Sequence, residues 1–541
     1  MSFGRRSILM SKFKEWWIRD KRYVTLIKAA LLALLPLLCA MARCAVQGGS
    51  IGQVYLPGSQ WNDELFYYKQ VEGIITYGYP QGFFGFNESH ALKLSFAAWS
   101  PVLVFPWVLW GLMLGWNLMS PVICNIVLLT LACFFFVWLV KPTWKQLGIM
   151  ALLFCLYTPF SRYMLSAMPE IICFSMLILF YGAAVNYVER ERGYKLALLF
   201  VMAGVMTLMR PYLLLFLLLP GYFWVRKRGW KGAAGSAAVT AAVLVIYWSI
   251  KHYLGAEYFA PLFFTDWVEA FFQGGLLEGL RFTLGKLYYM GKSFGAYTLQ
   301  GIRGGMASGA YFAGYLAMLC VFTAQSIKDW KRKENKGRLA IQLHMIFSFV
   351  AMLFALLLMY KLTEGSKHLL TFMAAGIFIL ALMDTRYYKK AVFMGAVFAY
   401  LYIYMAVDPM DYQVPFTTQE RVEQVKAWEE IFREELELSL EGGTPCFENV
   451  VIWVFSDTDS TGTRNTDWQL LYALPEGFGI SCCMPDYIKE NLDMLQSRYL
   501  AVLSGGEIDA MCAEAGYREI GRDASLVVYE RIRSSQQPWT D

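Results

Sequence analysis

Two adjacent carboxylates, Asp63 and Glu64, stand in an aromatic stretch that begins at Trp61 and reads Trp-Asn-Asp-Glu-Leu-Phe-Tyr-Tyr. A carboxylate beside a substrate can take the proton of a hydroxyl group while that oxygen attacks an electrophilic carbon. The same residues also fit an N-terminal helix cap, because Asp is favoured just ahead of a helix. The residue types and spacing leave both roles open. Neighbouring side chains on a strand or turn point in different directions, so we expect one carboxylate to face a substrate.

Three basic residues, Arg162, Arg210 and Lys367, stand at the ends of apolar runs. A charge at membrane depth is costly, so a basic residue there is a candidate for function. Arg can bind phosphate through two parallel N–H bonds. The alternative is that these side chains reach up to lipid headgroups. Pro211 fixes Arg210 between two short apolar runs, which favours function at Arg210 and leaves both roles open at the other two.

Other polar residues in the same regions are weaker candidates. Glu170 opens an apolar run, where it could contact a substrate or interact with the positive end of a helix dipole. Glu88 and His90 could help to bind an acceptor or a divalent cation. Two candidate ligands without a third make a weak metal site, so we assign no metal ligand. An isolated histidine such as His90 or His368 is more often a hydrogen-bonding residue of the packed interior.

The composition requires a non-aqueous environment for most of the chain. Hydrophobic residues make up 57% of the 541 residues and charged residues 17%, whereas an average soluble domain has about 25% charged residues. The apolar residues form long blocks with Trp and Tyr at their ends, as membrane-spanning helices do. The net charge of +6 comes from short basic clusters between these blocks. This placement indicates membrane topology and argues against nucleic acid as a partner.

The apolar runs predict a polytopic α-helical membrane protein with about eleven spans. The runs cover residues 24–46, 94–116, 117–140, 146–160, 169–187, 195–209, 211–225, 233–254, 306–325, 340–360, 368–383 and 391–407. The basic clusters lie at 5–22, 141–145, 190–192, 226–231, 328–338 and 386–390. By the positive-inside rule these clusters are cytoplasmic, so an even number of crossings must separate them.

One of the three runs before Lys141 should therefore not cross the membrane. We choose 94–116, because it contains Pro101, Pro106 and several Trp residues. Proline breaks the helical hydrogen-bond ladder, and Trp prefers the membrane interface. We expect a helix that lies on or dips into the outer leaflet, with an ordinary kinked span as the alternative.

This topology divides the chain into three parts. Residues 1–23 form a cytoplasmic basic N-terminus, and residues 24–407 form the transmembrane domain with outer loops at 47–116 and 255–305. Residues 408–541 form a small extracytoplasmic α/β domain. Its predicted helices are 417–440, 487–496 and 507–515, and its predicted strands are 449–455, 499–503 and 525–529. The four tail cysteines, Cys446, Cys482, Cys483 and Cys512, could form one or two disulfides of undetermined pairing.

The order and sidedness of these motifs resemble the GT-C superfamily of membrane glycosyltransferases. The likeness is to family 39-like enzymes similar to bacterial aminoarabinose transferases and protein mannosyltransferases, and it covers roughly residues 20–410. An acidic pair follows the first span in that family. The other matching motifs are Trp99-Ser100-Pro101 with Gly115, Pro159 to Arg162 leading to Pro169-Glu170, Met209-Arg210-Pro211, and Glu364 to Leu369 with Lys367-His368. Trp-Ser-Pro occupies the place of the commoner Pro-Pro, and Lys-His that of the commoner Arg-Tyr. These departures bear on the identity of the substrate more than on the reaction class.

The resemblance implies transfer of a sugar from a polyprenyl-phosphate donor to a glycan, lipid or protein acceptor at the outer face of the cell membrane. The leaving group is already a phosphate, so one carboxylate suffices and the reaction is an inverting single displacement. Asp63 would be the base and Glu64 its partner or substitute. Arg210, Arg162, Lys367 and His368 would bind the donor phosphate. Glu170, Glu88 and His90 would bind substrate, and no cofactor is required, although a divalent cation could take part.

Two other functional classes fit the many apolar runs. A flippase, polymerase or ligase of lipid-linked oligosaccharides has a similar architecture but does not need the early acidic pair. A non-catalytic membrane scaffold could use the tail to bind a partner. Replacing Asp63 and Glu64 with their amides distinguishes these classes, because transfer by the first mechanism requires a carboxylate.

Overall fold

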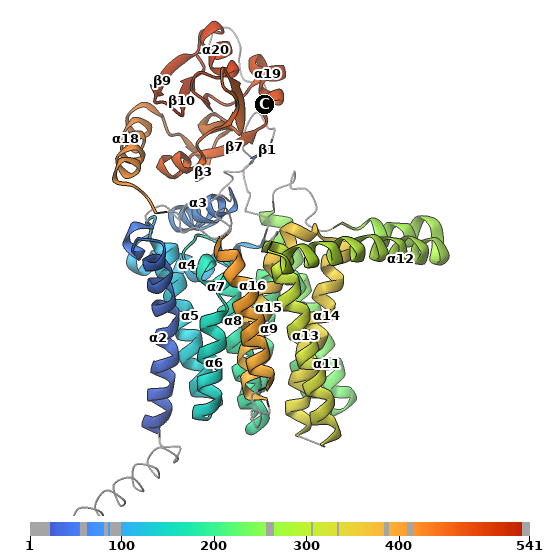
Figure 1. The fold of residues 1–541 in the computed structure, drawn as a ribbon. Coiled ribbons are helices and arrows are strands. Elements are labelled where there is room, and N and C mark those ends of the chain that lie inside the picture. The colour runs from blue at the N-terminus through green and yellow to red at the C-terminus, as the bar shows by residue number, and fades with distance from the viewer. Residues whose placement is uncertain are drawn as a thin grey trace, which may run out of the picture.

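A bundle of long helices carries a compact α/β domain on one of its ends (Figure 1). The computed structural model describes residues 22–54, 62–80, 85–86, 99–255, 264–304, 307–332, 335–383, 389–407 and 416–532. The molecule is thus the predicted polytopic helical protein with a small α/β tail, and the last bundle helix ends at Val407.

Each of the bundle helices overlaps one of the predicted apolar runs. They are α2 (Arg22–Val46), α5 (Ser120–Val140), α6 (Trp144–Leu156), α8 (Glu170–Glu189), α9 (Gly193–Met209), α10 (Leu218–Arg228), α11 (Trp230–Leu254), α13 (Ala307–Lys331), α14 (Lys336–Met359), α15 (Leu362–Leu382) and α16 (Lys389–Val407). In the part of the chain that the structure describes, 7 helices are long and apolar enough to cross a membrane, and α6 and α9 are apolar but shorter. The total of about eleven spans stays a prediction.

The apolar helices differ in what covers them. Most of α8 and α15 is enclosed by other helices, whereas none of the most apolar stretch of α11 is buried within the protein. A helix that is apolar all round must be covered by protein or by lipid. We therefore expect α11 to face lipid, while α8 and α15 form the centre of the bundle.

The basic turns between helices lie together at the end opposite the α/β domain (Figure 1). Ion pairs connect neighbouring turns there: Arg226 contacts Glu191 at 2.5 Å, and Arg338 contacts Glu189 at 3.9 Å. In α2, Lys28 donates to the carbonyl of Pro142 in the next turn at 2.8 Å. This clustering agrees with the even number of crossings expected between the basic clusters.

Short helices lie across the other end of the bundle, beneath the α/β domain (Figure 1). They are α3 (Asn62–Tyr77) and α4 (Phe105–Leu114), with a 3-10 turn, η2 (Pro101–Val104), ahead of α4. Trp107 in α4 donates to the amide oxygen of Asn125 in α5 at 3.0 Å. With 10 residues, α4 is too short to cross about 30 Å of hydrocarbon. Its position at the membrane interface stays a prediction.

The second outer loop, 255–305, contains a long helical element that we did not predict. This element, α12, spans Asp266–Ile302, and Gly275 reverses the chain inside it with φ 76°. The segment lies between the apolar runs 233–254 and 306–325, which is why we expected a loop there. The two arms fold against each other, since Lys286 contacts Asp266 at 2.5 Å.

The α/β domain is built on a 6-stranded sheet with the order β1-β7-β4-β8-β10-β9. The strands are β1 (Gly85–Phe86), β7 (Gly479–Cys483), β4 (Val450–Val454), β8 (Tyr499–Val502), β10 (Val527–Glu530) and β9 (Arg518–Arg522). The helices are α18 (Gln419–Glu435), α19 (Pro485–Asn491) and α20 (Glu507–Glu514). The predicted strands near 450, 500 and 527 and all three predicted helices are present, while β7 and β9 were missed.

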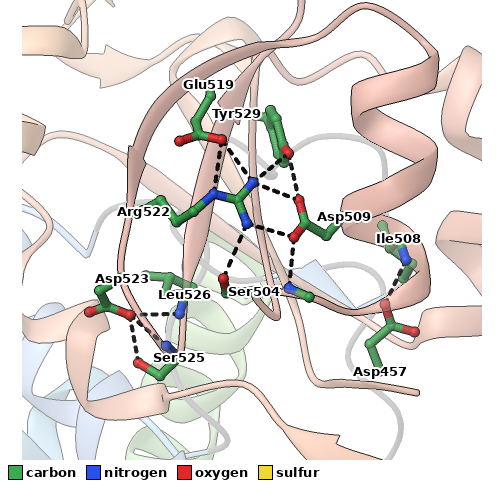
Figure 2. A network of polar contacts seen from close by, with 11 residues as sticks. Asp457, Ser504, Ile508, Asp509, Glu519, Arg522, Asp523, Ser525, Leu526 and Tyr529 are labelled. Carbon is green, nitrogen blue, oxygen red and sulfur yellow. Dashed lines mark hydrogen bonds and ion pairs between the residues drawn. The ribbon is translucent and has the colours of Figure 1, made fainter. Parts of the chain in front are cut away.

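A network of polar contacts fastens α20 to the antiparallel edge of this sheet (Figure 2). Arg522 binds both oxygens of Asp509, at 2.7 and 3.0 Å. Tyr529 donates to Asp509 at 2.5 Å, and the backbone N–H of Gly505 donates to it at 2.7 Å. Asp457 accepts from the N–H of Ile508 at 2.6 Å, close to the start of α20. These carboxylates are satisfied by protein groups, so we assign the network a structural role.

All eleven cysteines lie within the described ranges, and all are free thiols. The disulfides considered for the tail are therefore absent. Cys482 and Cys483 alternate along β7, so that each joins the hydrophobic core on a different face of the sheet. They serve as small buried apolar residues.

The first outer loop is joined to the α/β domain at several points. Its strand β1 pairs in parallel with β7, with Gly85 opposite Ser481. In α3, Lys69 donates to the carbonyl of Leu474 at 2.7 Å. Gly477, with φ +99°, approaches α3 so closely that a Cβ there would lie 2.5 Å from the Tyr77 hydroxyl oxygen. The helix that begins with Asp63 and Glu64 is thereby held between the bundle and the tail.

Lys69 provides a test of this connection. The buried Lys69 ammonium also pairs with Glu72 at 2.7 Å, and burial raises the pKa of Glu72. Replacing Lys69 with Met leaves the Glu72 carboxylate without a cation, so we expect a loss of about 3 kcal/mol in the free energy of unfolding. Chemical denaturation measures this loss, and limited proteolysis should show faster cleavage of the α/β domain. The double variant Lys69→Met/Glu72→Leu should recover part of the loss, and equal losses in both variants would contradict this account.

Candidate functional site

Asp63 and Glu64 begin α3 and point to different partners, as expected for adjacent residues. Asp63 accepts from the Lys367 ammonium at 3.0 Å, and the Asp63 side chain is 45% exposed. Glu64 is buried and accepts from the backbone N–H of Ala167 at 3.1 Å. Asp63 therefore remains accessible from outside, whereas Glu64 ties α3 to the segment ahead of α8.

A buried cluster centres on Arg210, which follows the last residue of α9 and precedes Pro211. Arg210 contacts Glu170, the first residue of α8, at 2.7 Å, and neither side chain is exposed. The same guanidinium donates to the hydroxyl of Tyr212 at 3.1 Å and lies 3.1 Å from Nδ1 of His368. The proline after Arg210 ends the helix and so places the guanidinium at a fixed height between α8 and α15.

Lys367 and His368 connect the two groups of charges. Both lie in the first turns of α15, where Lys367 contacts Asp63 and His368 contacts Arg210. Arg162, in the short helix α7 (Pro159–Met164), lies near enough to interact electrostatically with Glu64. The structure thus brings together seven of the predicted site residues from five separate helices or helix ends. They are Asp63, Glu64, Arg162, Glu170, Arg210, Lys367 and His368.

Burial controls the protonation of the second carboxylate. The enclosed position of Glu64 raises its pKa well above the usual value, because water no longer solvates the charged form. Asp63 and Glu170 add to this rise by charge repulsion, and the Ala167 N–H and Arg162 oppose it. Because burial favours the protonated form of Glu64, that residue is the poorer base, and the half-exposed Asp63 is the better candidate of the pair.

Aromatic residues around the cluster were missed in the sequence. The Trp99 ring lies over the Arg210 guanidinium, 5.1 Å from ring centroid to Cζ. The His368 ring packs edge-to-face with Trp99, Tyr212 and Tyr360, with centroids 5.3, 5.3 and 5.4 Å away. Tyr212 follows the Arg210-Pro211 motif directly, and Trp99 opens the Trp-Ser-Pro motif, so both could have been inferred from position. No comparable sequence signal marked Tyr360.

Three buried polar atoms of the cluster have no hydrogen-bond partner among the described residues. They are Nε of Arg210, Oε2 of Glu170 and Nε2 of His368. Buried polar groups in native proteins nearly always have a partner, so unsatisfied ones indicate a place for water or a bound polar ligand. These atoms could be satisfied by water or a neutral polar group, and the partly exposed cation of the site is Lys367, beside Asp63.

Glu88 and His90 lie outside the described residues, so their predicted roles in binding substrate or a divalent cation stay predictions. Within the described ranges, no group of three or more His, Cys, Asp or Glu side chains is arranged to hold a metal ion.

The raised pKa of Glu64 makes stability depend on pH. The carboxyl titrates near pH 4.3 in the unfolded chain and at a higher pH in the folded one. Between these values the folded state binds more protons, so the free energy of unfolding falls as pH rises. We expect Glu64→Gln to reduce this fall, because an amide does not titrate. The fold should be kept, because the amide oxygen can still accept from the N–H of Ala167. Thermal unfolding from pH 5 upward measures it, and the exposed variant Glu278→Gln is the control. Equal slopes for wild type and Glu64→Gln would contradict the assignment.

The Arg210–Glu170 pair gives a second test. Replacing Arg210 with Met leaves a carboxylate buried without its cation, which should lower the free energy of unfolding by about 3–5 kcal/mol. In the double variant Arg210→Met/Glu170→Leu no unpaired charge remains, so we expect stability to return most of the way to wild type. Denaturation in detergent micelles measures both. If the double variant is as unstable as the single one, the unpaired buried charge is not the cause of the lost stability.

No protein-family model and no curated protein matches the chain. Among solved structures, the archaeal oligosaccharyltransferase AglB from Archaeoglobus fulgidus, in complex with an inhibitory peptide and a dolichol-phosphate, is similar over 92% of this chain and 73% of its own, with 13% identity and a TM-score of 0.47. ArnT from Cupriavidus metallidurans bound to undecaprenyl phosphate is similar over 94% of this chain and 98% of its own, with 11% identity and a TM-score of 0.42. ArnT is an aminoarabinose transferase, one of the enzyme groups that the sequence motifs resemble. Because these TM-scores are below 0.5, the functional proposal rests on the chain's own residues.

Proposed function

We propose that this chain is a membrane glycosyltransferase that moves a sugar from a polyprenyl-phosphate donor to an acceptor hydroxyl group. The observation that carries the proposal is the partly exposed Asp63–Lys367 pair, 3.0 Å apart, next to the buried Arg210–Glu170–His368 cluster. A transferase of this kind needs an accessible base, and it needs cations held in place at the ends of the membrane-spanning helices. The order of the motifs, which resembles that of GT-C enzymes, supports the same function.

Asp63 acts as the base in this mechanism. The acceptor oxygen attacks the anomeric carbon of the sugar from the side opposite the phosphate, and its proton passes to an Asp63 oxygen. The new carbon–oxygen bond forms as the bond to the phosphate oxygen breaks, and that electron pair leaves with the phosphate. A single displacement inverts the configuration at the anomeric carbon. The half-exposed position of Asp63 lets an acceptor approach from outside the bundle.

Lys367 is the first candidate for contact with the departing phosphate, because it is partly exposed and already beside Asp63. Arg210 is fully buried and paired with Glu170, so it adds positive potential and holds His368 in place. Charges fixed in a water-poor site act strongly on the charge that develops in the transition state. Arg162 lies near enough to Glu64 to interact with it electrostatically and contributes in the same way. Glu64 and Glu170 are positioning residues in this scheme.

The orientation of the chain is part of the proposal. The basic turns gather at the end of the bundle opposite Asp63, which supports a cytoplasmic N-terminus and an extracytoplasmic α/β domain (Figure 1). The reaction then takes place at the outer face. An alkaline phosphatase fusion at the C-terminus should be active, and a cytoplasmic reporter there should not.

Replacing Asp63 with Asn tests the role of the base. We expect transfer to fall by about 10²–10⁴-fold without loss of the fold, because a partly exposed ion pair contributes less than about 1 kcal/mol. The matched control is Asp266→Asn, which removes another half-exposed Asp–Lys pair, with Asp266 48% and Lys286 17% exposed, outside the site. Mass spectrometry of cells that lack the chain should show accumulated polyprenyl-phosphate sugars. The wild type and Asp266→Asn should clear them, and Asp63→Asn should not.

Binding of undecaprenyl phosphate to the purified variants separates the base from the phosphate site. Asp63→Asn should bind the lipid at least as well as wild type, because an opposing negative charge is gone, whereas Lys367→Met should bind it more weakly. Full clearance by Asp63→Asn would remove the support for acid–base transfer. That result would favour a flippase or polymerase function for this fold.

A further inference from the structure

The helical element α12 carries a large exposed apolar surface. Its exposed apolar side chains include Leu276, Leu277, Leu280, Leu284 and Tyr288, with Leu277 83% and Leu284 63% exposed. Soluble proteins rarely leave so many large apolar groups uncovered on one element. Another surface must cover them.

The C-terminal end of α12 lies at the level of the bundle rather than above it. Tyr400 in α16 donates to the carbonyl of Ile302 at 3.1 Å, and Tyr400 lies about two turns, or roughly 10 Å, before the end of that helix. Gly301 and Gly309 let α12 and α13 cross in backbone contact, since a Cβ at Gly309 would lie 1.8 Å from the Tyr297 carbonyl oxygen. The rings of Phe294 and Phe312 stack at 4.5 Å. This end of α12 therefore lies within the depth of the spans.

The other end of α12 forms a hairpin that extends sideways beyond the bundle (Figure 1). The backbone N–H of Phe264 donates to the carbonyl of Met359, the last residue of α14, at 2.9 Å. Lys286 is paired with Asp266 at this point, so residues 266–286 project past α14 by roughly 15 Å. The hairpin runs across the helix axes (Figure 1), as a helix at a membrane surface does.

An apolar stripe runs along the projecting arm, with polar residues beside it. Leu277, Leu280, Leu284 and Tyr288 are spaced by three and four residues and form one stripe along the helix. Glu278 and Gly285 are spaced by seven and form a second stripe, about 80–100° around the helix from Leu277, and the exposed Arg281 lies between the two stripes. Gly279 and Lys286 face the short arm, against Phe271 and Asp266.

We propose that the hairpin 266–286 lies on the outer surface of the bilayer, with Leu277, Leu280 and Leu284 in the acyl region. Lipid is the occupant that the position favours, because the anchors at Met359 and Ile302 fix the arm at the ends of the spans, and the projecting part passes over bilayer. An exposed leucine stripe with the charged residues Arg281 and Glu278 beside it is the composition of a helix that lies in the interface, where a long arginine side chain reaches the headgroups. This contact widens the footprint of the protein on the side of α14, and it requires no particular reaction at Asp63.

Photo-crosslinking from neighbouring positions tests the proposal. Benzoylphenylalanine replaces Leu277 or Leu284 in two variants, and Glu278 or Gly285 in two matched variants whose side chains lie on the polar stripe. All four positions are exposed, and a Cβ at Gly285 meets no atom within 4 Å, so the full chain should fold in each case. The proteins are illuminated in nanodiscs of phosphatidylethanolamine and phosphatidylglycerol, and mass spectrometry measures the lipid adducts.

We expect the lipid adducts from Leu277 and Leu284 to exceed those from Glu278 and Gly285 several-fold. Equal yields from both stripes, or no lipid adduct from either leucine position, would overturn the proposal. A covalent dimer from Leu277 or Leu284, seen as a band of twice the mass, would also overturn it in favour of a second copy of the chain. Clearance of polyprenyl-phosphate sugars by the Leu277→Glu/Leu284→Glu variant is read separately, because loss of the lipid contact does not require loss of transfer.

Discussion

A guanidinium and a carboxylate buried together at the end of a helix bundle impose the strongest constraint on this structure. Removing Arg210 and Glu170 from water is tolerable only while the two stay paired and their remaining polar atoms find partners. The pair joins the end of α9 to the start of α8, and His368 brings α15 to the same point. Three helices from distant parts of the sequence are thus fixed in relative height. Lys367, one residue before His368, is consequently held where it meets Asp63. The accessible ion pair depends on the buried one.

Much of the architecture could be predicted because a bilayer makes simple demands on sequence. Every bundle helix overlaps a predicted apolar run, and the short basic turns gather at one end of the bundle. The tail helices and the strands near 450, 500 and 527 follow local patterns in the same way. The elements that were not predicted have no local pattern in the sequence. The strand β7 reads Gly-Ile-Ser-Cys-Cys without alternation, and α12 is interrupted by glycines. The pairing of Gly85 with Ser481 joins residues almost 400 positions apart, which only tertiary packing decides.

The candidate site shows the same division. An acidic pair in an aromatic stretch selected Asp63 and Glu64, and position at the ends of apolar runs selected Arg162, Arg210 and Lys367. The structure brings these residues together. The sequence could not show how the two carboxylates differ, because burial decides that and burial is a property of the fold. It also could not show that Trp99 covers the Arg210 guanidinium, since ring orientation follows from packing. Sequence predicts which charges are unusual, and structure assigns each an environment.

The α/β domain is connected to the site through α3, and its Tyr472 lies near enough to Glu64 to interact with it electrostatically. Helix α3 carries Asp63 in its first turn, and farther along its length Lys69 is buried against Leu474 while Tyr77 meets Gly477. A small rotation of α3 would move Asp63 away from Lys367, and the contacts with the tail oppose that rotation. Proton transfer requires donor and acceptor atoms within hydrogen-bond reach, so the tail would act on transfer through position alone. Any change in the position of the domain would therefore reach Asp63 through α3, because the domain is joined to the first outer loop through both β1 and Lys69.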